Sequence, residues 1–333
     1  MTRRLLISVV LVSMVAGCAP PKGQTPIVLG KLKHEEALFG WAPPFQRNVP
    51  SFDHRNRAYI RSRAEDLDST AFVHALSDGA WAKRGFLDAV KKAYPTFVAT
   101  RLGGGWCPSR VVFDDDDHAY TLLRIELADK SQKSLLLHSR DGCATWQITE
   151  LPDGQFTMEH WTGHNAIPGP PPIGVLTKLE DHPGKWASVM RLSVYFPKKT
   201  EEGIDLGEPV VVSGPDGFSW FPDMTVDPSG FVHLVWCLTT PLENRRGLKE
   251  QVEYTRWDGA SWLPPNDIVP ISPDIVRNAI ASDARGNLHL IFGGSVYERG
   301  LSLYHQRAFM DDAWSAQAWS APHLLNQGIS YMG

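Results

Sequence analysis

One short segment carries a carboxylate, two imidazoles, an indole and an amide within seven residues: Glu159, His160, Trp161, His164 and Asn165. A positioned histidine or carboxylate can transfer protons as a general acid or base, and an indole offers a flat apolar face beside a polar N–H group. The segment is therefore a candidate catalytic or sugar-binding loop, with Glu159, His160 and His164 as candidate catalytic residues. The alternative is a structural segment whose polar groups satisfy neighbouring backbone groups.

Two patterns could indicate a metal ion. His160 and His164 lie four residues apart, which suits one face of a helix, but the surrounding glycine and proline residues disfavour a helix. The acidic run 114–117 could bind calcium, but it coincides with the first turn of a repeated unit, where a solvated turn is expected. The sequence therefore predicts no metal and no other cofactor.

Further side chains suited to an acidic ligand recur at matching points of the repeats. Arginine binds a carboxylate or sulfate through two parallel hydrogen bonds, and tryptophan adds stacking surface. The candidate ligand-binding residues are Arg63, Trp106, Arg110, Trp161, Asn165, Asp223 and Arg277, and Tyr297 beside Glu298 is a further candidate catalytic residue.

A repeated phrase predicts the elements that would position these residues. Each copy reads as a strand, a tight turn rich in Asp, Gly or Asn, and a second strand of alternating or β-branched residues. The copies contain Asp53, Asp114, Asp227 and Asp283. Neighbouring copies lie about 60 residues apart, and the longer middle gap has room for two units. His118, His233 and His289 recur in the second strands, which favours a packing role over catalysis.

A second phrase, a turn that ends on tryptophan, follows the first by about 30 residues and contains Trp81, Trp146, Trp262 or Trp314. The interval has room for a third strand, and the tryptophan would open a fourth and bury its ring between units. Four short strands in each repeated unit are typical of a β-propeller blade.

The predicted fold is an all-β propeller of about five four-stranded blades, with modules at 42–100, 101–155, 156–212, 213–270 and 271–333. Six blades are the alternative, because segments 26–38 and 329–333 could complete another. The third module lacks the turn-tryptophan phrase, so 175–197 and 204–213 must supply its strands. A short helix is expected over 81–94. The candidate site residues would meet at the mouth of the central channel, the funnel.

The turn from Ser139 to Trp146 resembles the Asp box of the sialidase-like (BNR-repeat) propellers, Ser-x-Asp-x-Gly-x-Thr-Trp, with Cys143 in place of the glycine. That glycine position often needs a positive φ. The resemblance implies a propeller fold, with the box as a structural turn on the face away from the substrate. The Phe/Tyr-Arg-Ile-Pro motif, which supplies the family's first substrate-binding arginine, is missing. The segment Tyr59–Ser62 is the most similar to it, but its residues are in a different order. Sialidase activity is therefore not expected.

The first residues of the chain predict its cellular localisation. Residues 1–17 read as a signal peptide, with Arg3 and Arg4 before an apolar run too short to span a bilayer. The end of the run, Val15 to Cys18, resembles the lipobox of bacterial lipoproteins, which implies cleavage and acylation at Cys18. The alternative is an ordinary signal peptide with an incidental cysteine. Residues 18–41 would form the lipid-anchored tether and 42–333 the propeller. Ala19 favours the outer membrane.

The net charge and the sequence features above limit the classes of binding partner that we expect. A formal net charge of −4 gives no reason to expect nucleic acid. The expected partners are the lipid bilayer, through acylated Cys18, and a glycan or an envelope protein. One hypothesis is a lipid-anchored envelope protein that binds carbohydrate, in particular an acidic glycan, in the funnel. The alternatives are a glycoside hydrolase or polysaccharide lyase on the same face, and a non-catalytic protein–protein adaptor. Whether the chain is an enzyme stays open.

The lipobox predicts that replacement Cys18→Ala releases the protein from membranes. Stable attachment needs more than one acyl chain, and all of the predicted lipid is attached through this cysteine. The test is labelling of cells with a fatty-acid analogue, with membrane fractionation of the wild type and the variant. Absence of label in the wild-type protein would contradict the prediction.

Overall fold

The structure, a computed structural model, describes residues 51–61, 72–77, 80–98, 111–157, 169–178, 190–214, 217–241, 248–269, 275–294 and 302–327. Over these residues the regular structure is nearly all β, apart from helix α4 (Leu87–Ala93) and the short 3-10 helix η3 (Ala316–Ala318). The predicted all-β class is therefore confirmed. None of the helices in these ranges has the length and apolar character to cross a membrane.

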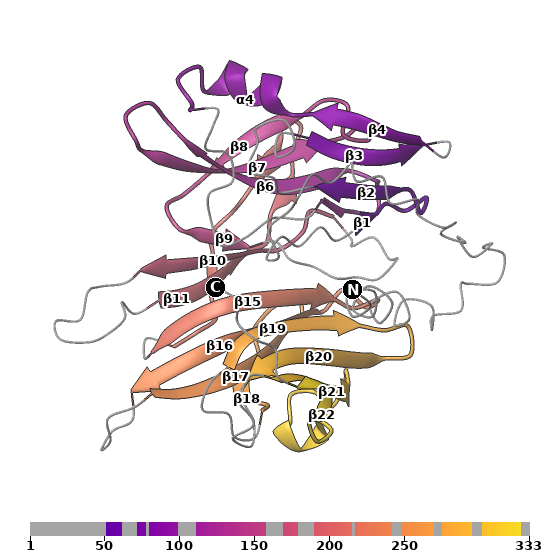
Figure 1. Ribbon diagram of the computed structural model, residues 1–333, viewed down its shortest axis with the longest axis vertical. Coiled ribbons are helices and arrows are strands. Elements are labelled where there is room, and N and C mark those ends of the chain that lie inside the picture. The colour runs from indigo at the N-terminus through magenta and orange to yellow at the C-terminus, as the bar shows by residue number, and fades with distance from the viewer. Residues whose placement is uncertain are drawn as a thin grey trace, which may run out of the picture.

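Three four-stranded antiparallel sheets follow the chain order (Figure 1). The first contains β1 (Ser51–Phe52), β2 (Ala58–Arg61), β3 (Phe72–Ser77) and β4 (Ala80–Gly85). The second contains β5 (Val112–Phe113), β6 (Ala119–Glu126), β7 (Gln132–Ser139) and β8 (Gln147–Leu151). The last contains β19 (Ile275–Ser282), β20 (Asn287–Gly294), β21 (Ser302–Phe309) and β22 (His323–Gln327).

Two further groups of four strands lie between them in the chain. The third group contains β9 (Gln155–Thr157), β10 (Ile173–Lys178), β11 (Met190–Tyr195) and β14 (Val210–Val211). The fourth contains β15 (Phe218–Val226), β16 (Val232–Pro241), β17 (Leu248–Trp257) and β18 (Asn266–Asp267). One parallel bridge, from Met190 to Phe218, joins the two groups into an eight-stranded sheet. A separate hairpin of β12 (Lys198–Lys199) and β13 (Ile204–Asp205) is inserted before β14.

The third module takes only part of its strands from the expected segments 175–197 and 204–213: β10, β11 and β14 fall largely within them, but β9 precedes them, and residues 204–205 belong to the separate hairpin. The helix predicted over 81–94 is only half correct, because strand β4 occupies residues 80–85 and α4 begins at Leu87. Strand β4 pairs with β3 over its whole length, so backbone pairing overrides the helical spacing of the apolar residues.

The four aspartates of the repeated phrase hold the same turn in four sheets. In each, one carboxylate oxygen accepts the backbone N–H groups two and four residues later, and the other accepts a side-chain donor six residues later, in the second strand. The sets are Asp53 with Arg55, Arg57 and Tyr59; Asp114 with Asp116, His118 and Tyr120; Asp227 with Ser229, Phe231 and His233; and Asp283 with Arg285, Asn287 and His289.

These turns need a left-handed backbone at the residue after the first N–H donor. Asn56, Asp117, Gly230 and Gly286 occupy that position with φ between 59° and 85°. Asparagine, aspartate and glycine are the residues that tolerate this conformation best. The repeated composition of the turn therefore follows from its geometry.

The structure corrects the alignment of the recurring histidines. His233 and His289 bind the turn aspartate through Nε2, at 3.2 and 3.1 Å. His118 lies two residues too early, and the hydroxyl of Tyr120 makes the equivalent contact with Asp114 at 2.7 Å. A phenol and an imidazole both place one donor at this distance from the strand, and letter matching alone does not reveal that equivalence.

The Asp box keeps its geometry despite the cysteine. Asp141 accepts the N–H of Thr145 at 2.8 Å, and the hydroxyl of Ser139 accepts the N–H of Cys143 at 3.0 Å. Cys143 adopts a φ of 68°, as the pattern requires of its glycine. Its side chain is fully buried, and burial raises the pKa of the thiol to about 12. Within the described ranges, neither Cys143 nor Cys237 takes part in a disulfide bond.

Apolar side chains pack between consecutive sheets. The ring of Tyr59 lies 4.5 Å from that of Phe113, between the first and second sheets. Trp236 belongs to the cluster shared by the second, third and fourth groups. Tyr254 belongs to the cluster between the fourth and last groups. Each sheet therefore buries its apolar residues against a neighbour.

The turn-tryptophan prediction holds for Trp146, which is buried directly before β8, but is wrong for Trp314, which is 57% exposed. Residues 311–319 form turns and η3 before β22 begins at His323. The ring that reaches the core is therefore Trp319, whose Nε1–H donates to the carbonyl of Ala313 at 2.9 Å. Trp262 is half-buried, and Trp81 lies in β4 with its side chain outside the described part.

One pair of carboxyl groups lies away from the turns. Glu253 of β17 is 7% exposed and is paired across the strands with Asp267 of β18. The side-chain amide of Gln251 contacts both carboxyl groups, each at 3.1 Å. Burial, together with the negative charge of Asp267, raises the pKa of Glu253 to about 7, and burial also raises the pKa of Asp267.

Replacement Trp146→Ala should lower the free energy of unfolding by roughly 3–5 kcal/mol, the usual cost of emptying a large aromatic site in a packed interior. Trp314→Ala is the matched control and should change it by less than about 0.5 kcal/mol, because that ring is exposed. Chemical denaturation measures both. Equal effects in the two variants would contradict the packing described for Trp146.

The Glu253 pair predicts that stability falls with rising pH. A carboxyl group whose pKa is raised by folding binds more protons in the native state. Its contribution is complete below the unfolded pKa and is lost as pH rises through about 7. We expect a loss on the order of 2–3 kcal/mol between pH 4.5 and 7.5 from this group.

Thermal melts across this pH range measure the effect. Glu253→Gln should be more stable than the wild type at pH 7.5 and should flatten the dependence. Glu208→Gln, at an exposed glutamate, should leave it unchanged. If the stability of Glu253→Gln falls with rising pH as steeply as that of the wild type, other groups cause the effect.

Candidate functional site

Most side chains predicted to form the funnel site lie outside the described residues. These are Arg63, Trp106, Arg110, Glu159, His160, Trp161, His164, Asn165 and Tyr297. Cys18, the predicted acylation site, also lies outside the described residues. Arg277 lies in β19, with only its backbone described. Their meeting in one funnel stays a prediction.

Asp223 is the one predicted ligand-binding residue whose side chain is described. It is 7% exposed and follows an irregularity in the pairing of β15 with β16. One carboxylate oxygen accepts the N–H of Ile280 at 2.8 Å, which connects β15 to β19. The carboxylate therefore joins two neighbouring sheets, and its predicted contact with a ligand stays untested.

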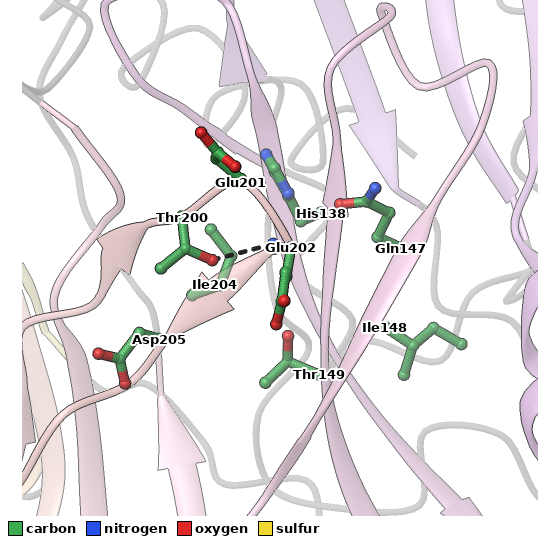
Figure 2. Close-up of a pocket in the computed structure, with 10 residues that line it drawn as sticks. His138, Gln147, Ile148, Thr149, Thr200, Glu201, Glu202, Ile204 and Asp205 are labelled. Atoms are coloured by element: carbon green, nitrogen blue, oxygen red, sulfur yellow. Dashed lines mark hydrogen bonds between the residues drawn. The ribbon is translucent and has the colours of Figure 1, made fainter.

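A polar groove lies along the second sheet, next to the turn that joins β7 and β8. Its volume is about 550 Å³. Strands β7 and β8 form one wall and the inserted β12–β13 hairpin forms the other (Figure 2). The lining residues are His138, Gln147, Ile148, Thr149, Thr200, Glu201, Glu202, Gly203, Ile204 and Asp205.

The hairpin wall is fixed to the second sheet by charged contacts. The ammonium of Lys199 lies 2.8 Å from the turn carboxylate of Asp114 and also contacts Asp116. The guanidinium of Arg140 donates to the carbonyl of Thr200 at 3.2 Å. Within the hairpin, the hydroxyl of Thr200 accepts the N–H of Gly203 at 3.1 Å (Figure 2). The groove is therefore a defined space between two connected elements.

His138, the last but one residue of β7, forms the buried part of the wall. Its side chain is 2% exposed, and its ring stacks on Tyr120 at 4.9 Å and meets His118 edge-on. Within the part of the chain that the structure describes, neither ring nitrogen makes a hydrogen bond. An unpartnered buried polar group costs about 1–3 kcal/mol.

The protonation state of His138 follows from its surroundings. Burial, together with the nearby His118 and Arg140, lowers its pKa to about 4. At neutral pH the imidazole is therefore uncharged, with one nitrogen able to donate a hydrogen bond and the other able to accept one. Both nitrogens are shielded from solvent in this structure, so a ligand hydroxyl can fill either role only after a small movement of the groove wall.

The acidic run beside the groove is a junction between sheets. The hairpin turn is confirmed at this position, but its side chains are not simply solvated. Asp114 is fully buried, Asp115 accepts the N–H of Gly169 at 3.2 Å, and Asp117 accepts the N–H of His54 at 2.6 Å. The ligand atoms of Asp114, Asp116 and His118 lie within 4.8 Å of one another. Lys199 already supplies a positive charge there, which disfavours the calcium interpretation.

Sequence reasoning missed this groove. The Asp-box resemblance placed the end of the sheet that carries this turn away from any substrate, and His138 stands alone in its strand. The available signal was the run from Lys198 to Asp205, in which two lysines are followed by acidic residues around a Thr-Glu-Glu-Gly turn.

No protein-family model matches the chain, and no curated protein matches it in sequence. Among solved structures, the chain is similar to an ulvan lyase of a polysaccharide lyase family (11% identity, 78% of this chain and 66% of that one, TM-score 0.47). It is also similar to a thermostable family-43 glycoside hydrolase (12%, 89% and 98%, 0.42) and to the Trypanosoma rangeli sialidase (11%, 75% and 40%, 0.42). At these scores the likeness carries no argument about activity.

Proposed function

We propose that this chain is a lipid-anchored β-propeller of the bacterial cell envelope that binds carbohydrate. The observation that carries the binding proposal is the groove beside the Asp box, with the unpartnered imidazole of His138 in its wall. Carbohydrates present many hydroxyl groups, each of which donates and accepts hydrogen bonds, and the groove offers matching partners from Gln147, Thr149 and Thr200.

The arrangement of the strands supports the propeller. Successive groups of four antiparallel strands pack face to face through shared apolar clusters. The first strands of neighbouring groups lie in contact, β1 with β5 and β15 with β19, as expected of inner strands around a common axis. Five blades account for the described strands, and a sixth is the alternative.

We propose a second, separate ligand site in the funnel. Arg63, Arg110 and Arg277 would bind an acidic glycan there, and His160 or His164 would act on it if the protein is a hydrolase or lyase. The anchor at Cys18, with delivery to the outer membrane, rests on the lipobox and on Ala19.

A second candidate function is a protein–protein adaptor. Phe309 and Trp314, in and after β21, are 64% and 57% exposed. Large exposed apolar side chains favour contact with another surface.

Replacement His138→Phe tests the carbohydrate proposal. Phenylalanine keeps an aromatic ring against Tyr120 but removes both nitrogens. We expect binding of neutral oligosaccharides to weaken at least tenfold, a loss of about 1.4 kcal/mol. The melting temperature should stay the same or rise, because two unpartnered buried nitrogens are removed.

Isothermal titration of the purified protein with a panel of oligosaccharides measures the affinity. His323→Phe, in the exposed part of β22, is the matched control and should bind as the wild type does. Unchanged affinity in a folded His138→Phe protein would remove the groove as the carbohydrate site.

A further inference from the structure

The groove carries negative charge. Three of its lining residues, Glu201, Glu202 and Asp205, bear carboxylates, and all three lie on the hairpin. Neither lysine nor arginine is among the described residues that line it. His138 adds no positive charge at neutral pH, because burial holds its pKa near 4.

The nearest cations are already engaged. The ammonium of Lys199 lies between Asp114 and Asp116, behind the hairpin. The guanidinium of Arg140 donates to the carbonyl of Thr200. These contacts hold the wall in place, while Glu201 and Glu202 line the groove and are exposed to solvent.

This charge pattern selects among carbohydrates. A uronate or sulfated sugar would bring a like charge against the hairpin, which disfavours binding. A neutral sugar would use only the hydroxyl partners. A sugar with a protonated amine would gain charge-assisted hydrogen bonds to carboxylates, which are shorter and stronger than neutral ones.

We propose that the groove binds a saccharide that bears a free amino group. Its ammonium contacts Glu201 or Glu202 of the hairpin, and its hydroxyl groups contact His138 and Thr149 on the opposite wall. The inference rests on the proposed carbohydrate binding and gives this site a ligand class different from the acidic glycan proposed for the funnel.

Three oligosaccharides of equal length provide the test: a tetramer of glucosamine, its fully N-acetylated counterpart, and a tetramer of a uronic acid. Titrations at pH 6, where amines are protonated, should give the tightest binding for the free amine. The acetylated tetramer should bind about tenfold more weakly. Added salt should weaken binding of the amine more than that of the acetylated sugar.

The charge is removed by the double replacement Glu201→Gln with Glu202→Gln. This variant should lose about tenfold in affinity for the free amine and should no longer distinguish it from the acetylated sugar. Glu208→Gln, outside the groove, is the matched control and should change affinity less than twofold. All three glutamates are exposed, so the melting temperature of both variants should equal that of the wild type.

The outcomes separate this inference from the general function. Equal affinity for the amine and the acetylated sugar, or a double variant that binds as the wild type does, overturns the amine proposal and leaves carbohydrate binding intact. Binding of the uronate tetramer that depends on Arg63 or Arg110 places the ligand in the funnel and also overturns it. If none of the three tetramers binds, both proposals fail together.

Discussion

A buried carboxylate that bridges a turn and the following strand is the interaction on which this structure depends. Asp53, Asp114, Asp227 and Asp283 each bind two backbone N–H groups with one oxygen and a phenol or imidazole with the other. A buried charge is tolerated only when it is well paired. Because one carboxylate binds both the backbone of the turn and a side chain of the next strand, it fixes the positions of both.

The consequences extend from the turn to the groove. Asp114 holds Tyr120 through its hydroxyl, and Tyr120 supports the ring of His138. The same carboxylate also binds Lys199, which positions the hairpin opposite. One turn residue therefore orders both walls of the groove. Burial of His138 itself lowers the pKa of its ring, against the opposing charge of Asp114, and keeps the ring neutral.

Sequence patterns predicted the repeating architecture well because turns have strict local requirements. The spacing of the aspartates located four turns, and the turn predicted from Ser139 to Trp146 forms even with a cysteine at its left-handed position. Such patterns failed at Trp314, which was predicted to be buried. The buried ring is that of Trp319, and the path of the chain through η3, which the pattern does not predict, determines which of the two reaches the core. The equivalence of Tyr120 with His233 could not be predicted either. The two residues differ in type, and they are equivalent only because each places a hydrogen-bond donor at the same distance from its strand.

The groove could not be predicted because it is made by an insertion. Local patterns describe contacts within a repeat, and His138 meets the hairpin from 60 residues away in the chain. The charges of 198–205 were visible in the sequence, but their role depends on the contacts of Lys199 and Arg140 with the second sheet. Long-range electrostatic contacts of this kind have no periodic signature.

The inserted hairpin also has an evolutionary consequence. Its two strands pair only with each other, and the strand ladder of the third group continues from β11 to β14 without them. The loop from Thr200 to Gly203 can therefore lengthen, shorten or change charge while every inter-strand hydrogen bond of the surrounding sheets is kept. The four positions of this loop can therefore vary in sequence without loss of strand pairing in the scaffold.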